Sequence, residues 1–200
     1  MEKITRNETP DFLKEKAEEW GKEWSAKQVT AKKMGKTATF SWRQYKKQEY
    51  KEILAQLQLM TDNCAYCNIR PLHIEVAPKP SIDHFRPKTT FPLLAYEYGN
   101  LFPCCEVCQE RGNRFDELLL KPDEQNYDFD AYFIIDFPTG ELRANPQGNG
   151  KQKSRADKTI ELFKLNSAGK SQARLKELRC YEDNQMELSD LSYHFFLTRS

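Results

Sequence analysis

Two Cys-x-x-Cys pairs enclose the residues of this sequence that are best suited to chemistry. Cys64 and Cys67 form the first pair, and Cys105 and Cys108 form the second. Each such turn aims two sulfurs at one point, so the two pairs together can close a tetrahedral zinc site. Four thiolates leave no open position for water, and the spacing therefore predicts a structural Zn²⁺ ion. Cys104 competes with Cys105 as a ligand, but only Cys105 gives the regular two-residue spacing.

A carboxylate, an imidazole and an amide lie between the two pairs. His84 can serve as a general base, because an imidazole holds a lone pair near neutral pH. Asp83 offers the hard oxygen that Mg²⁺ or Mn²⁺ prefers, and Asn100 can cross-link the intervening loop through its side-chain amide. The alternatives are a structural or zinc-bound histidine at position 84 and a simple Gly-Asn turn at position 100.

A short ββα unit is expected to position these residues. The chain from 64 to 122 is rich in turn-forming residues, and we expect strands over residues 81–85 and 101–104, followed by a helix from about Glu106. Adjacent residues of a strand point to opposite faces. Asp83 and His84 can therefore serve one site only if the strand ends or bends there.

Helices are expected on the N-terminal side of this unit. The first should run from about Thr9 through Trp24, where charged residues form the outer face. Residues 28–39 are expected to form a linker. A second helix, capped by Ser41, should start at Trp42, because apolar residues recur after it at helical spacing.

The C-terminal side is expected to combine a strand pair with helices. Residues 127–136 alternate aromatic and polar side chains as a strand would, and residues 141–144 are its expected partner. A helix capped by Ser154 and a final helix ending near Tyr181 should follow. The apolar tail within residues 182–200 either packs back on the core or docks into a partner, and we favour docking.

Composition narrows the classes of function. The 200 residues are 38% hydrophobic and carry a net charge of +1, so bulk charge gives no sign of nucleic-acid binding. A basic stretch between Lys27 and Lys47 is best explained as a solvated helix face and linker. The sequence predicts neither a membrane-spanning segment nor a secretory signal. The expected location is the cytoplasm, where the spacing of the cysteines favours zinc over disulfides.

The order of these motifs resembles that of the HNH, or ββα-metal, endonuclease family. Cys-x-x-Cys, Asp-His-Phe-x-Pro-Lys, Asn-Leu and Cys-x-x-Cys follow one another between residues 64 and 108. The most similar form is the nuclease subunit of Septu-type antiphage systems, and the similarity extends to about residue 179. The resemblance implies a mostly helical α+β fold, in which a zinc-stapled, treble-clef-like ββα-metal module lies between N-terminal and C-terminal helices.

The resemblance also implies roles for individual residues. His84 would activate water, Asp83 would hold a catalytic Mg²⁺ or Mn²⁺ ion, and Asn100 would hold the catalytic loop. The third motif position, usually Asn or His, falls on Gln109, which still presents an amide carbonyl on a side chain one methylene longer. Four basic residues are expected to contact nucleic acid, with a solvated surface as the alternative: Arg86, Lys88, Arg111 and Arg114.

Partners and domain organisation follow from the same resemblance. We expect nucleic acid as the substrate and an ABC-type or SMC-like ATPase subunit as the partner, in some systems with a retron reverse transcriptase and its DNA. Four regions are expected in the chain: an N-terminal helical extension (1–60), the zinc-stapled nuclease core (61–122), a strand pair with C-terminal helices (123–181) and the tail (182–200).

Two other functions fit the same residues. A non-catalytic zinc module could serve as an adaptor for protein or nucleic acid, and Gln109 is the feature that favours this alternative. A nuclease could also act on RNA, such as tRNA, because nothing in the sequence reads a base or a 2′-hydroxyl group.

Overall fold

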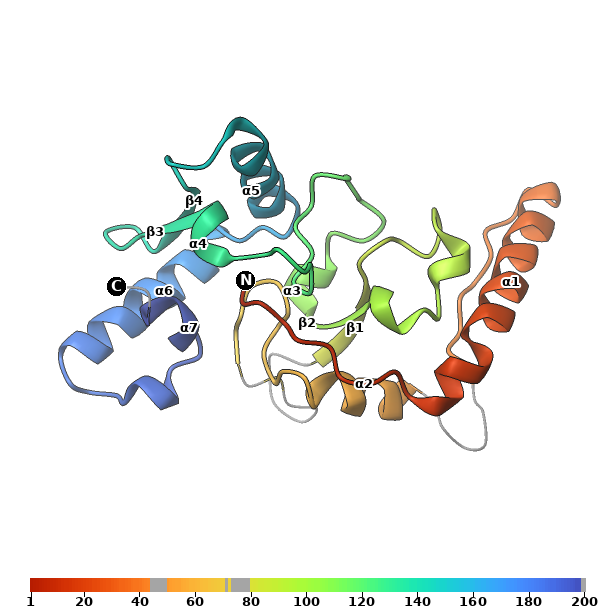
Figure 1. Ribbon diagram of the computed structural model, residues 1–200, viewed down its shortest axis with the longest axis horizontal. Coiled ribbons are helices and arrows are strands. Elements are labelled where there is room, and N and C mark those ends of the chain that lie inside the picture. The colour runs from red at the N-terminus through yellow and green to blue at the C-terminus, as the bar shows by residue number, and fades with distance from the viewer. Residues whose placement is uncertain (44–49, 71, 73–79, 199–200) are drawn as a thin grey trace.

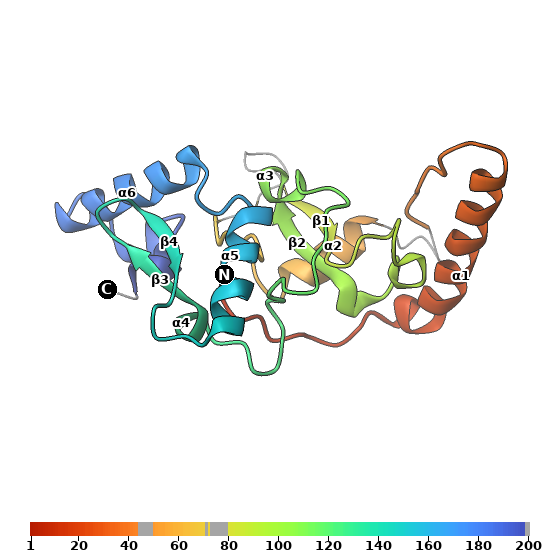
Figure 2. The same ribbon diagram turned by 90° about the horizontal axis from the view of Figure 1, so that it is seen from above.

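The chain folds into an elongated molecule with helices at both ends and a short hairpin between them. The computed structural model describes residues 1–43, 50–70, 72 and 80–198. Helix α1 (Asp11–Lys33) lies at one end and helix α6 (Ala168–Glu182) at the other (Figure 1). The hairpin of β1 (Pro80–His84) and β2 (Leu101–Cys105) lies between them in both views (Figure 2).

The central hairpin confirms the two strands that the sequence predicts. β1 and β2 pair antiparallel, with Pro80 opposite Cys105 and His84 opposite Leu101. All five residues of β2 are buried, as expected for a strand that is covered on both faces. The short helix α3 (Glu106–Gln109) follows β2 directly, so the order of elements is ββα. Two 3₁₀ turns, η1 (Pro92–Leu94) and η2 (Tyr98–Asn100), shape the connection between the strands.

Two N-terminal helices pack against the hairpin and the loop that joins its strands. Helix α2 (Tyr50–Gln58) and α1 share a hydrophobic core with Ile82 of β1 and Leu101 of β2. The helices contribute the buried side chains Phe12, Leu13, Ala17, Trp20, Trp24, Ile53, Leu54 and Leu57.

The limits of these helices differ from the sequence-based expectation. α1 begins at Asp11, with Pro10 as its N-cap residue and no side-chain cap from Thr9. It continues to Lys33, so the first half of the expected linker is helical, because Ala, Lys and Gln are good helix formers. Gly35, at a φ of +66°, supplies the left-handed residue that follows the helix. Trp42 is not helical, and residues 44–49 lie outside the described residues.

The C-terminal part is a second hairpin with helices packed around it. β3 (Phe133–Asp136) pairs antiparallel with β4 (Glu141–Ala144), which confirms the expected partner strand. The expected strand over residues 127–136 is wrong in its first half, where α4 (Phe129–Tyr132) forms. Its aromatic residues turn into the core there, and tertiary packing therefore overrides the alternating pattern.

The helix after this hairpin starts earlier than the sequence suggested. α5 (Gly150–Leu162) is capped by Asn149, whose side chain accepts a hydrogen bond from the Gln152 backbone while Gln152 bonds back to Asn149. Ser154 is not the cap: it lies inside the helix and its hydroxyl donates to the carbonyl of Gly150. The sequence signal was present as Asn-x-x-Gln, a variant of the usual capping box.

The apolar tail packs inside the chain. After η3 (Leu188–Asp190), helix α7 (His194–Leu197) brings Phe195 and Phe196 against Phe129 of α4, with ring centroids 5.3 and 5.8 Å away. Tyr193, Phe195 and Phe196 are all buried. These aromatic residues therefore pack back on the core, which is the alternative to docking. Their rings are buried, so they offer no surface to a partner in this structure. In the described ranges, no helix is long and apolar enough to cross a membrane.

A close approach between α1 and η1 gives a test of this arrangement. A Cβ atom added to Gly21 of α1 would lie 2.5 Å from the carbonyl oxygen of Leu93. We expect Gly21→Ala to lower the free energy of unfolding by about 1–3 kcal/mol, because backbone must shift to make room. The matched control is Gly169→Ala in α6, where a Cβ atom meets nothing within 4 Å. Urea unfolding should find this control unchanged or slightly stabilised, and equal stability losses in both variants would contradict the packing.

Candidate metal centre and catalytic pocket

Four cysteine sulfurs converge where β2 and α3 meet the loop after α2. The Sγ atoms of Cys64, Cys67, Cys105 and Cys108 all lie within 4.8 Å of one another, and those of Cys67 and Cys105 are 3.7 Å apart. Tetrahedral zinc with sulfur at about 2.3 Å separates its ligands by about 3.8 Å. The donor set and its spacing therefore fit a divalent metal such as zinc, as the sequence predicts.

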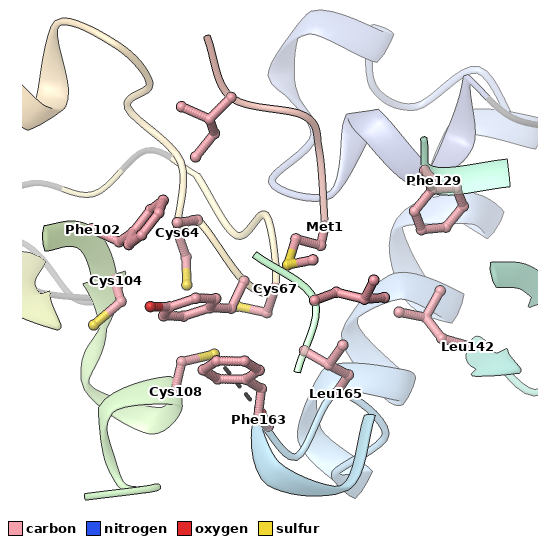
Figure 3. Packing of buried hydrophobic residues seen from close by; sticks show 14 of the residues in the cluster. Met1, Cys64, Cys67, Phe102, Cys104, Cys108, Phe129, Leu142, Phe163 and Leu165 are labelled. Carbon is pink, nitrogen blue, oxygen red and sulfur yellow. Dashed lines mark hydrogen bonds between the residues drawn. The ribbon is translucent and has the colours of Figure 1, made fainter. Parts of the chain in front are cut away.

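The fifth cysteine of this region is not part of the cluster. The sulfur of Cys104 points away from those of Cys64 and Cys108 (Figure 3) and lies 3.1 Å from the hydroxyl of Ser81. Cys104 and Cys105 are adjacent in a strand, so their side chains leave on opposite faces. This alternation selects Cys105 as the ligand.

The environment of the sulfurs favours a cation. Burial opposes ionisation of Cys64, yet hydrogen bonds from the neighbouring thiols hold its pKa well below the usual value. Burial and the same neighbours raise the pKa of Cys108 well above it. A divalent cation bound here would replace the remaining thiol protons, so that all four cysteines could hold it as thiolates.

The second candidate site surrounds His84 at the end of β1. The Nε2 atom of His84 lies 2.9 Å from the carbonyl oxygen of Ala95. A carbonyl only accepts hydrogen bonds, so Nε2 carries the proton and Nδ1 keeps its lone pair. The ring of Trp42 stacks on the imidazole, with centroids 5.3 Å apart and planes 15° from parallel, and Phe40 meets it edge-on. The imidazole is thus held in one orientation and one tautomer.

The protein keeps this imidazole neutral. Burial, the positive charge of Lys88 and that of Arg111 lower the pKa of His84 to about 3, although the carbonyl of Ala95 opposes the shift. Burial also lowers the pKa of Lys88, with Asp83 acting against it. His84 therefore enters any reaction at neutral pH as an unprotonated base.

Asp83 is held by two buried partners that the sequence did not reveal. Its Oδ2 atom accepts hydrogen bonds from the hydroxyl of Tyr66 at 2.7 Å and from the guanidinium of Arg111 at 2.7 Å. Every hydrogen bond to this carboxylate that we observe in the described part of the chain ends on Oδ2. Oδ1 is thus the oxygen that Asp83 can offer to a cation.

Arg111 was expected on the surface, in contact with nucleic acid, but the structure places it in the interior. Its side chain has no exposed surface, and besides Asp83 it donates to the carbonyls of His84, Phe85 and Arg114. The guanidinium therefore ties the end of β1 to the segment after α3. A sequence offers no signal for this role, because the arginine follows α3 at a position that looks solvated.

The pair of Arg111 and Asp83 makes a stability prediction. Removing one partner of a buried ion pair leaves the other charged and without a partner, which typically costs about 3–5 kcal/mol. We expect Arg111→Met to lose stability of this order in urea unfolding, while Arg114→Met, at an exposed position three residues later, should change it by less than about 0.5 kcal/mol. Similar effects of the two substitutions would contradict the buried pair.

The side-chain amides of Asn100 and Gln109 both form hydrogen bonds with the backbone of the central hairpin. The Oδ1 atom of Asn100 accepts from the backbone N–H of Arg86 at 2.8 Å, and its Nδ2 atom donates to the carbonyls of Arg86 and Leu94. Asn100 thereby cross-links the loop between the strands, as predicted from its amide. The Nε2 atom of Gln109 donates to the carbonyl of Ile82 at 3.2 Å, so its Oε1 atom is the end that remains for a ligand.

A small pocket joins the candidate catalytic residues. It encloses 90 Å³ and is lined by residues of β1, the loop after it and the end of α3: Ile82, Asp83, His84, Pro87, Lys88, Gln109, Gly112 and Asn113. The structure thus brings Asp83, His84, Lys88 and Gln109 to one pocket. Arg86 does not line it: Arg86 forms an ion pair with Glu117, and its guanidinium lies about 5 Å from the rings of Phe91 and Phe115.

Comparison with known proteins supports a relation to Septu systems. A stretch of 63 residues is 33% identical to the Septu protein PtuB of Bacillus thuringiensis. The match covers 32% of this chain and 24% of PtuB, so the two share about a quarter of the length of the relative. No protein-family model matches the chain. Together with the cysteine cluster, the match supports a Septu-like, metal-binding protein of the α+β class; the HNH resemblance stays a prediction.

Proposed function

We propose that this chain is a metal-dependent HNH-type endonuclease that hydrolyses phosphodiester bonds as the effector subunit of a Septu-like defence system. The observation that carries the proposal is the fixed tautomer of His84. Ala95 accepts the Nε2 proton at 2.9 Å, so Nδ1 can act as a base in the pocket that Asp83 and Gln109 also line. The match to PtuB supports the defence context.

The proposed reaction uses the chain's own residues as follows. Nδ1 of His84 takes a proton from a water molecule, whose oxygen bonds to phosphorus as the bond from phosphorus to the 3′ oxygen breaks. The 3′ oxygen takes up a proton from solvent, and the cut leaves a 5′-phosphate and a 3′-hydroxyl group. Trp42 and the carbonyl of Ala95 keep the imidazole aimed, while Asn100 holds the loop that carries Pro87 and Lys88. Lys88 places a positive charge beside the pocket, where the phosphate would enter.

The proposal includes a divalent cation beside this base. Oδ1 of Asp83 and Oε1 of Gln109 are hard oxygen donors of the kind that Mg²⁺ and Mn²⁺ prefer. Such an ion, when bound, stabilises the charge that develops on the leaving oxygen. Arg111 holds the carboxylate through Oδ2, which leaves Oδ1 as the oxygen available to such an ion.

The cysteine cluster would have a structural role in the same enzyme. Four sulfur ligands leave zinc no open position, so catalysis belongs to the pocket beside it. Removing the ligands should therefore unfold the module rather than change its chemistry.

Cleavage of nucleic acid by the purified protein tests the proposal. The ATPase subunit expected of a Septu-like system should be co-expressed, because the near-neutral charge of this chain gives it little affinity of its own for a polyanion. We expect cleavage to require Mg²⁺ or Mn²⁺. It should stop when a weak chelator removes these ions and leaves structural zinc in place. Sequencing the ends formed in expressing cells distinguishes DNA from RNA, including tRNA, and detects any retron DNA involved.

A non-catalytic zinc adaptor is the second candidate. It is favoured by the ion pair of Asp83 with Arg111, which already neutralises the expected metal ligand, and by the low exposure of His84, at 6%. Metal-independent binding of the partner together with no cleavage under any divalent ion would select this function.

A further inference from the structure

The cysteine cluster creates a charge problem when it holds zinc. Four thiolates around one Zn²⁺ ion carry a net charge of −2. All four cysteines are at most 2% exposed, so water solvates this charge poorly. Buried charge is costly unless a charge of opposite sign or hydrogen-bond donors compensate it.

A buried lysine from a distant part of the chain meets the cluster. The Nζ atom of Lys170, in the first turn of α6, lies 3.2 Å from the Sγ atom of Cys108 and 2.9 Å from the carbonyl oxygen of Phe163. Lys170 is only 6% exposed, and lysine is almost never buried without a partner. Its two partners here are one sulfur and one carbonyl.

The surrounding structure brings Lys170 to this place. Phe163 follows the last turn of α5 and stacks on Tyr66 of the first cysteine turn, with ring centroids 3.8 Å apart. Its carbonyl also lies 3.8 Å from the sulfur of Cys108, a contact drawn in Figure 3. The turn between α5 and α6 therefore places the ammonium group of Lys170 against the cysteine cluster.

We propose that Lys170 is an outer-sphere residue of the metal site, which compensates the charge of the zinc-bound thiolates by donating a hydrogen bond to Cys108. The residue does not ligate the metal. It lowers the free energy of the loaded cluster and links it to α6, so that metal loading favours docking of the C-terminal helices. This role depends on the cysteine cluster and not on the proposed nuclease activity.

Metal retention measures this role directly. Zinc-loaded full-length protein is mixed with a colorimetric chelator, and zinc release is followed over time. Outer-sphere partners typically change metal affinity by about 10–100-fold. We expect Lys170→Met to release zinc at least about 10-fold faster than the wild type. Lys170→Arg, which keeps the charge and a donor, should stay near the wild type. The matched control is Lys176→Met, at an exposed position of the same helix.

A spectroscopic readout separates this role from a general loss of stability. In cobalt-loaded protein, sulfur-to-metal charge-transfer absorption reports on the electrons of the thiolates. Without the N–H donor, the lone pairs of Cys108 rise in energy, so we expect the band to move to longer wavelength in Lys170→Met and to stay in Lys176→Met. Unchanged zinc release together with an unchanged band would overturn the proposal.

Two further variants decide the outcome if Lys170→Met does not fold. Lys170→Gln keeps a donor without the charge, and Lys170→Arg keeps both. Faster zinc release from the glutamine variant than from the arginine variant supports charge compensation. Equal release from the two, at the wild-type rate, would show that charge plays no part.

Discussion

Replacing Cys67 with serine is expected to unfold the central module of this chain. Structural zinc contributes about 10–16 kcal/mol in small zinc-binding peptides, which is comparable to the whole stability of a typical domain, about 5–15 kcal/mol. The sulfurs of the cluster lie in a core that also holds Tyr66, Phe102 and Phe163, so loss of the metal removes the centre around which these rings pack. Metal analysis should fall from about one zinc per chain to near zero.

The control for this prediction is Cys104, which is adjacent to the cluster cysteine Cys105 in β2. Cys104 is as buried as Cys105, but its sulfur faces Ser81 rather than the cluster. We expect Cys104→Ser to keep its zinc and to lose no more than about 2 kcal/mol of stability. Circular dichroism and thermal unfolding of both variants provide the comparison. A Cys67→Ser protein that is folded without metal would show that the cluster is not a structural staple.

Replacing His84 with glutamine is expected to abolish cleavage of nucleic acid. A positioned general base typically contributes about 10²–10⁴-fold to the rate, and we expect a loss of this size. Glutamine is chosen because its amide N–H can still donate to the carbonyl of Ala95, while its uncharged amide is no base. The measurement is divalent-dependent cleavage by the purified complex, with the zinc content of both proteins confirmed first.

The same substitution at another histidine serves as the control. His194 lies in α7 and is not among the residues that line the pocket of His84, so His194→Gln should leave the cleavage rate unchanged. If His84→Gln cleaves at the rate of the wild type while it retains zinc, His84 is not the base. The adaptor function would then be the better account of the chain.

Local spacing was enough to predict that four cysteines come together and that Asp83 and His84 lie at the end of a strand. The two Cys-x-x-Cys turns, the strand that ends in Asp83 and His84, and the turn that carries Asn100 are each encoded by a short run of residues. Each depends on backbone geometry that a short segment determines by itself, such as the turn of a knuckle or the alternation of a strand. The strands of the hairpin were predictable for the same reason.

The partners of these residues depended on contacts between distant segments. Arg111 looked like a surface arginine until the fold buried it against Asp83, 28 positions away, and Lys170 reaches Cys108 across 62 positions. The helical first half of residues 127–136 and the burial of Phe195 and Phe196 likewise follow from packing that no local pattern records.

The sequence by itself thus determined the groups available for chemistry: four cysteine thiols, and the imidazole of His84 and the carboxylate of Asp83 at the end of β1. Only the tertiary structure decided the protonation, orientation and hydrogen-bond partners of these groups. It fixed the tautomer of His84 through the carbonyl of Ala95 and the orientation of its ring through Trp42, and it paired Oδ2 of Asp83 with Arg111. The physical reason is that protonation and charge compensation depend on burial and on neighbours in space, and both exist only once the chain is folded.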